Sequence, residues 1–155
     1  MKRFLSHPAI NAICLAMLST FYAVVTLLNE NKIVLESTQY YDRQHDRLSF
    51  IFEKWTVFLS NGYLKYLIIS LIALTTLAVI MLLFKKHSYD EYHVKILEKC
   101  LITALILTII SIGIFYLTIL VNPDGIIVKF TLFAMIHWMT IILADLFYVF
   151  KFNWR

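Results

Sequence analysis

Four long apolar runs alternate with charged connections along this chain. The runs cover residues 8–28, 63–84, 100–121 and 126–150, and almost every charged residue lies between them. A helix that rises 1.5 Å per residue needs about 20 residues to cross a hydrocarbon core of roughly 30 Å. Because lipid offers the backbone no hydrogen-bond partner, a run of this length has to be helical there. The pattern therefore predicts an all-α membrane protein, with residues 1–155 forming a single integral domain.

The connections between the runs predict how the spans are arranged. Residues 122–125, Asn-Pro-Asp-Gly, form a tight turn because proline presets φ and glycine accepts a positive φ. The third and fourth spans must then be antiparallel neighbours, and we expect an antiparallel four-helix transmembrane bundle. In the first connection, residues 29–47 are rich in charge and look solvated. Residues 48–59 are mainly apolar and aromatic but too short to span, so we expect an interfacial helix there.

Composition argues against an attached soluble domain. Hydrophobic residues make up 61% of the chain and charged residues 15%, against about 45–50% and about 25% in soluble domains. The longest connection, residues 29–62, is shorter than soluble domains that fold alone. No catalytic, metal or phosphate-binding motif occurs, and the net charge of +4 is not gathered in runs that would suit nucleic acid. We expect a non-enzymatic protein without a cofactor, whose partners are lipid and other membrane proteins.

The distribution of lysine and arginine predicts the orientation of the spans. Cytoplasmic segments of membrane proteins carry an excess of these residues near the span ends. With the N-terminus inside, the inner segments carry eight of them: Lys2, Arg3, Lys85, Lys86, Lys95, Lys99, Lys151 and Arg155. The outer segments carry six, most of them in the long first connection. We therefore expect both termini in the cytoplasm and a multi-pass protein of the plasma membrane.

Two sets of residues are candidates for packing or partner binding. Ala12, Ala16 and Thr20 follow one another at intervals of four in the first span, and small residues at that spacing let two helices approach closely. They form either an internal packing seam or a surface for a partner helix. Phe52 and Trp55 lie in the interfacial segment, which either anchors the second span or offers a docking surface in the outer leaflet.

His137 and Asp145 are the ionisable side chains well inside a span. Such residues are costly in lipid and normally face the bundle or a water-filled cavity. They lie eight residues apart, about 12 Å along a helix, so they cannot bond each other. His137 either bonds a Thr or Ser of a neighbouring span, ligates haem, relays protons or ions with Asp145, or contacts an intramembrane partner. Asp145 needs a partner on another helix or in the connection 85–99.

The layout resembles a known family, the four-span immunity proteins against pore-forming colicins of the A type. The shared features are a short basic N-terminus, a first external loop of a few dozen residues, a compact charged internal loop and a short basic C-terminal tail. The segment 96–102, Ile-Leu-Glu-Lys-Cys-Leu-Ile, is similar to the entry of the third span in that family. The resemblance implies an inner-membrane protein that binds the membrane-inserted helices of a toxin laterally, without catalysis.

Two other classes of function remain open. The chain could permeabilise the membrane as a holin-like or phage-defence effector, with self-association through the first span opening a path lined by Thr, Ser, His137 and Asp145. It could also be the membrane anchor subunit of a redox complex. A homo-oligomer is compatible with the first of these.

Overall fold

The computed structural model describes residues 8–44, 50–84 and 91–153, and the regular structure within these ranges is helical throughout. The helices, in chain order, are α2 (Pro8–Leu28), α3 (Glu30–Gln44), α4 (Phe50–Ser60), α5 (Leu64–Leu83), α6 (Glu91–Val121) and α7 (Ile126–Asn153). Four of them, α2, α5, α6 and α7, are long and apolar enough to cross a membrane. The prediction is confirmed to this extent: the described chain is helical, and four of its helices are long and apolar enough to span a membrane.

The third predicted span is wrong at its start. The apolar run begins at Cys100, whereas α6 begins nine residues earlier, at Glu91. Residues 91–99 alternate charged and apolar side chains that favour a helix as well as the apolar run does. Loss of hydrophobicity marks where a helix leaves lipid and does not mark where the helix ends. Helix α6 therefore extends beyond the apolar run into the charged connection.

The prediction of a solvated connection over residues 29–47 also needs correction. Helix α3 fills most of it and is separated from α2 by Asn29 alone. Its buried side chains, Ile33, Ser37 and Tyr40, are spaced four and three residues apart and so lie on one face. Among the charged residues of α3, Lys32, Asp42 and Arg43 are exposed, whereas Glu30 and Glu36 are half-buried beside this face. A helix is present where the interfacial helix was predicted: α4 begins at Phe50, and Leu48 and Ser49 lie outside the described residues.

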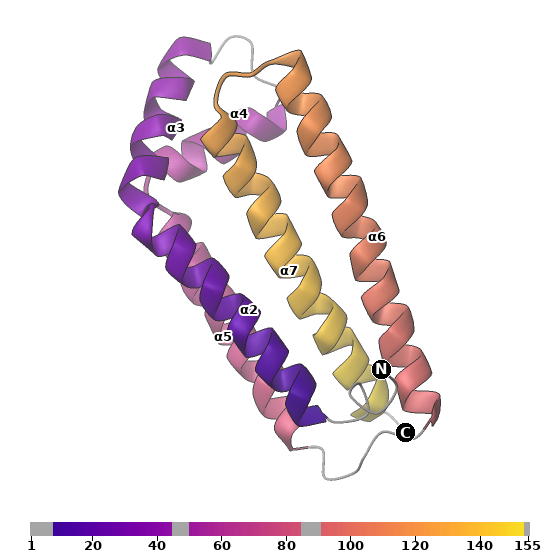
Figure 1. Ribbon diagram of the computed structural model, residues 1–155. Coiled ribbons are helices and arrows are strands. Elements are labelled where there is room, and N and C mark those ends of the chain that lie inside the picture. The colour runs from indigo at the N-terminus through magenta and orange to yellow at the C-terminus, as the bar shows by residue number, and fades with distance from the viewer. Residues whose placement is uncertain (1–7, 45–49, 85–90, 154–155) are drawn as a thin grey trace.

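The long helices form two side-by-side pairs (Figure 1). Helix α2 packs on α5, and α6 packs on α7, while α7 also contacts both members of the first pair. Helices α2 and α6 run toward the end of the molecule that carries α3 and α4, and α5 and α7 run away from it (Figure 1). As a result, the first residue of α2 and the last residues of α7 lie at the same end.

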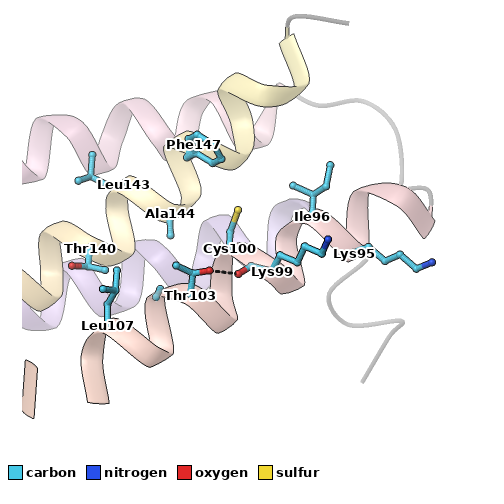
Figure 2. A pocket seen from close by; sticks show the side chains of 11 residues that line it. Lys95, Ile96, Lys99, Cys100, Thr103, Leu107, Thr140, Leu143, Ala144 and Phe147 are labelled. Atoms are coloured by element: carbon cyan, nitrogen blue, oxygen red, sulfur yellow. Dashed lines mark hydrogen bonds between the residues drawn. The ribbon is translucent and has the colours of Figure 1, made fainter. Parts of the chain in front are cut away.

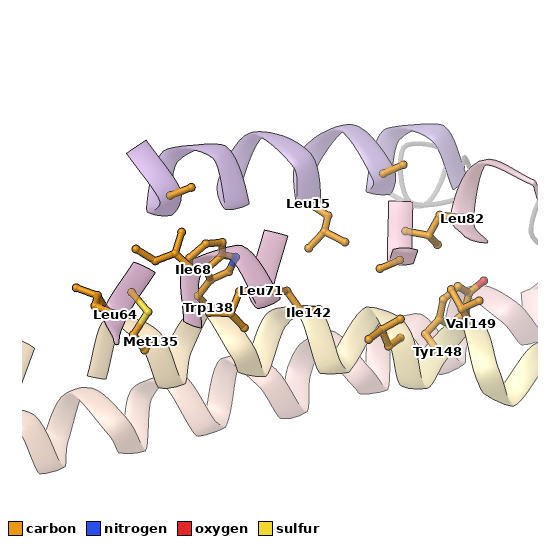
Figure 3. Close-up of a cluster of buried hydrophobic side chains, with 14 of the residues drawn as sticks. Leu15, Leu64, Ile68, Leu71, Leu82, Met135, Trp138, Ile142, Tyr148 and Val149 are labelled. Carbon is orange, nitrogen blue, oxygen red and sulfur yellow. The ribbon is translucent and has the colours of Figure 1, made fainter. Parts of the chain in front are cut away.

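The core lies where α2, α5 and α7 meet (Figure 3). On α5 the buried positions are spaced alternately four and three residues apart: Leu64, Ile68, Leu71, Thr75, Ala78 and Leu82. On α7 the same spacing links Val128, Thr131, Met135, Trp138, Ile142, Asp145 and Val149. This heptad spacing keeps one seam facing a neighbour when helices cross at a small angle, as in coiled coils. The opposite faces of both helices expose large apolar side chains, which suits contact with lipid.

Helices α3 and α4 close the end of the molecule where α7 begins. The turn before α7 has the predicted geometry, with Gly125 at φ +67°. The ring of Tyr40 from α3 covers Gly125 so closely that an added Cβ would lie 2.6 Å from it. Beneath this ring, Lys129 is buried, and its Nζ donates a hydrogen bond to the carbonyl of Asn122. The turn is thus held between α3 and the first residues of α7.

Candidate functional site

A groove runs along one side of α7 between α2 and α6. It consists of two cavities of about 300 Å³ and about 370 Å³, both lined by side chains of these three helices. His137 and Thr108 line both cavities, so the two meet end to end. The lining of α7 extends from Phe130 to Asp145, a length of about 22 Å of helix. We call this feature the α7 groove.

Asp145 lines the cavity nearer the chain termini. Its side chain is 6% exposed and takes its place in the α7 seam between Ile142 and Val149. Across the same cavity lies Asn11 of α2, whose Nδ2 is buried and has no hydrogen-bond partner in the described part of the chain. Among the residues that the structure describes, Asp145 receives neither the hydrogen bond nor the ion pair that the sequence analysis expected. The cavity is therefore roomy enough for water and contains polar groups that lack protein partners.

His137 stands where the two cavities meet. Its Nδ1 and the hydroxyl of Tyr22 on α2 share a hydrogen bond, and the two rings meet edge to face at 5.7 Å. A hydrogen bond to a Thr or Ser of a neighbouring span was one of the alternatives predicted for His137, and the partner in the structure is a Tyr. Tyr22 in turn stacks on the ring of Trp138, with 5.8 Å between centroids. This contact joins α2 to α7 and fixes which way the imidazole faces.

A second polar contact joins three helices behind the groove. Trp138 is fully buried, and its indole Nε1 donates to the hydroxyl of Ser19 at 2.9 Å. The hydroxyl of Thr75 on α5 lies 3.1 Å from the same Ser19 oxygen. Because buried donors without partners are costly in a low-dielectric interior, this arrangement favours one register of α2, α5 and α7. It supports the wall of the groove that carries Tyr22.

The predicted small-residue seam on α2 is only partly the one that the fold uses. Ala12 is buried, but Ala16 is half-buried and Thr20 is exposed, with its hydroxyl bonded to the carbonyl of Ala16 at 2.8 Å. The buried stripe runs through Ala12, Leu15, Ser19, Ala23 and Thr26. An interval of four residues advances 400° around a helix, so the predicted positions drift away from the contact face by about 40° at each step. The observed stripe combines steps of three and four residues, and so stays on that face.

The predicted docking pair on α4 faces inward in part. Phe52 and Trp55 are both half-buried. The indole Nε1 of Trp55 donates to the carbonyl of Val128 at 3.0 Å, which ties α4 to the start of α7. Phe50 and Ile51 are the large apolar side chains of α4 that remain exposed. Trp55 therefore serves the anchoring interpretation of this segment, and Phe50 and Ile51 provide its exposed apolar surface.

Several groove residues were missed by the sequence analysis. Asn11, Tyr22 and Ser111 are isolated polar or amphipathic residues inside apolar runs, which is the signal that could have marked them. Within the described residues, no three His, Cys, Asp or Glu side chains lie together in a way that could hold a metal ion. A comparison with known protein families, curated proteins and solved structures found no match. The function is therefore inferred from the groove and from the layout of the spans.

Proposed function

We propose that this chain is a multi-pass protein of the bacterial inner membrane whose four long helices span the bilayer as an antiparallel bundle. Both termini face the cytoplasm in this proposal, and α3 and α4 lie at the outer surface with α4 in the interface. The four apolar helices and their lipid-like outer faces support it. The clustering of α3 and α4 at one end, opposite Lys95 and Lys99, supports the polarity.

We further propose that the protein acts by binding a membrane helix of a partner in the α7 groove. The observation that carries this proposal is the buried carboxyl group of Asp145 in a cavity that three helices leave open. A buried carboxylate inside a membrane span is costly, and a hydrogen-bond donor from a partner offsets part of that cost. Helix α6 also leaves most of its surface exposed, which gives an incoming helix room to pack.

The partner that fits best is the membrane-inserted helical hairpin of a pore-forming toxin of the colicin type. The resemblance to colicin immunity proteins leads to this choice, and the groove fits its physical requirement. Protection against a pore needs lateral packing on apolar helices within the bilayer. The α7 groove, about 22 Å long and apolar apart from a few polar side chains, supplies a surface of that kind.

A protection assay tests this function. The full chain is expressed in toxin-sensitive bacteria, and survival is measured against a panel of A-type pore-forming colicins. Ala134→Phe fills the groove from α7, whereas the matched Ala73→Phe adds the same bulk to an exposed face of α5. We expect protection by the wild type and by the α5 variant, and its loss in the groove variant at equal membrane abundance. Full protection by Ala134→Phe, or no protection by the wild type against any member of the panel, would contradict the proposal.

One observation favours a second candidate, a membrane-permeabilising effector. Asn11, Asp145, His137, Tyr22 and Ser111 place polar groups along the whole length of the groove. Widened by self-association, such a row could conduct protons or ions. Induced expression then depolarises cells that contain a potential-sensitive dye, and Asp145→Asn reduces the effect. An immunity protein leaves the potential unchanged, so the same measurement separates the two candidates.

A further inference from the structure

A second cavity between α6 and α7 lies on the other side of their contact and has a different character from the α7 groove. It measures about 580 Å³ and is lined by the first half of α6 and the second half of α7 (Figure 2). Lys95 and Lys99 stand at the end of the cavity nearer the start of α6, and Leu107 and Thr140 mark the opposite end (Figure 2). Ala104, buried at the helix contact, separates it from the α7 groove.

Among the described residues that line the lysine end of this cavity, two carry a positive charge and none a negative one. Lys95 and Lys99 are four residues apart, so both lie on the face of α6 that borders the cavity. Neither forms an ion pair with an acidic residue in the described ranges, and Glu98 is not among the lining residues. Like charges at this spacing repel each other. An anion between them removes that repulsion and gains two charge-assisted contacts.

The rest of the cavity is apolar. Leu107, Leu143 and Phe147 form its walls, and the small side chain of Ala144 leaves space between them. The hydroxyls of Thr103 and Thr140 bond carbonyls of their own helices at 2.8 Å each, so they offer the cavity no free donor. The cavity follows α6 from Lys95 to Leu107, a length of about 18 Å, which is close to the depth of one leaflet.

We propose that this cavity binds one anionic phospholipid of the surrounding bilayer. The phosphate lies between the ammonium groups of Lys95 and Lys99, and an acyl chain follows the apolar cleft over Ala144. Basic pockets between membrane helices recognise anionic headgroups in this manner, and the charge at one end and the lipid-like walls beyond it match the two parts of such a molecule. This site is independent of the partner proposed for the α7 groove.

Native mass spectrometry of the full chain in detergent tests the proposal. Phosphatidylglycerol and phosphatidylcholine with identical acyl chains are the probes. We expect a single phosphatidylglycerol adduct that is preferred over phosphatidylcholine. The double variant Lys95→Gln/Lys99→Gln should weaken this adduct about 30-fold, the factor that two lysine contacts of ordinary strength provide. The matched double variant Lys54→Gln/Lys65→Gln removes two exposed lysines elsewhere and should leave the adduct unchanged.

A separate variant tests the apolar cleft over Ala144. Ala144→Phe fills the cleft and should weaken the adduct although both lysines remain, whereas Ala73→Phe on α5 should not. Equal binding of the two lipids, or an adduct that survives the loss of both lysines, would overturn the proposal. Displacement by millimolar inorganic phosphate would reduce the site to an anion site, and a dimer in place of the adduct would assign the cavity to a second copy. Either outcome overturns the lipid assignment.

Discussion

Two groups of polar side chains inside the four long helices differ in their hydrogen bonding. Ser19, Thr75 and Trp138 bond one another across three helices and stabilise the core. Asn11 and Asp145 face the groove and, within the described chain, form no such bond. We therefore expect the first group to stabilise the fold. We expect the second group, which is buried at a cost in free energy of unfolding, to serve the partner binding proposed above.

Ser19→Ala tests the group that stabilises the core. Removing the hydroxyl leaves the buried Nε1 of Trp138 without its acceptor, which costs about 1–3 kcal/mol. Thr20→Ala, one residue along α2, removes an exposed hydroxyl that bonds only its own helix and should cost less than about 0.5 kcal/mol. The free energies of unfolding in mixed micelles, measured by steric trapping, give the comparison. Equal losses for the two variants would contradict the proposed role of Ser19.

Asp145→Leu tests the group that faces the groove. Replacing a buried carboxyl that lacks a partner with an apolar side chain should raise the free energy of unfolding by about 1–3 kcal/mol. The same variant should lose toxin protection, because the donor of the partner helix loses its acceptor. Unfolding in micelles and survival in the protection assay are measured on the same variant. A destabilised protein would show instead that Asp145 is satisfied inside the fold.

At the scale of single residues, the sequence identified the ionisable side chains inside the spans but not the side chains that form hydrogen bonds between helices. His137 and Asp145 were recognisable because ionisable groups are rare in lipid. Tyr22, Ser19 and Thr75 were not, since Ser, Thr and Tyr occur throughout the apolar runs and most of them bond only their own backbone. Which of them reaches across depends on the rotation of each helix, and that is a tertiary property.

Between elements, α3 packs closely on the turn before α7. The ring of Tyr40 occupies the space that a side chain on residue 125 would need. Both the left-handed backbone and the close approach therefore require glycine at that position. Helix α3 thus protects the turn that keeps α6 and α7 together.

Gly125→Ala measures this fit. The added methyl group meets the Tyr40 ring at 2.6 Å and also strains a positive φ, so we expect a loss of about 2–4 kcal/mol. Gly62 has φ +70° but open space around it. Gly62→Ala therefore measures the backbone strain alone, at about 1 kcal/mol. If thermal unfolding of the two variants is indistinguishable, α3 does not pack on the turn as described.

The lengths of the long helices were predictable, because crossing lipid requires a minimum apolar length. The faces that these helices bury against one another were not predictable. The apolar runs gave the four long helices to within a few residues at most ends. The heptad seams of α5 and α7 were not visible, because the outward faces of these helices are as apolar as the inward ones. The amphipathic pattern of Ile33, Ser37 and Tyr40 in α3 was visible, but the surrounding charges led to the interpretation as a solvated connection.

At the scale of the whole molecule, the proposed topology can be tested with single cysteines. In a Cys14→Ser/Cys100→Ser background, Asn61→Cys lies in the exposed turn between α4 and α5, and Lys95→Cys lies near the opposite end of the molecule. An impermeant maleimide added to intact cells should label the first and not the second. Labelling of both after lysis is the control. The reverse pattern in intact cells would invert the orientation.

The order and spacing of the apolar runs predicted only part of the arrangement of the helices. The short turn at residues 122–125 correctly placed the last two spans side by side. Nothing in the sequence indicated that α7 would contact both α2 and α5 while α6 stayed at the edge. That asymmetry creates the α7 groove, because an edge helix leaves one flank of its neighbour open. The candidate site is therefore a product of helix arrangement and was beyond the reach of motif analysis.

The edge position of α6 has a mechanical consequence. Between Val94 and Val121, Leu97 and Ala104 are its buried residues, whereas α5 and α7 each bury a full seam. Among the long helices, α6 packs on α7 and makes few contacts with α2 or α5. Moving α6 outward therefore breaks fewer contacts between long helices than moving any other of them. Because α6 lines both the α7 groove and the lysine-lined cavity, the same outward displacement would widen the two together.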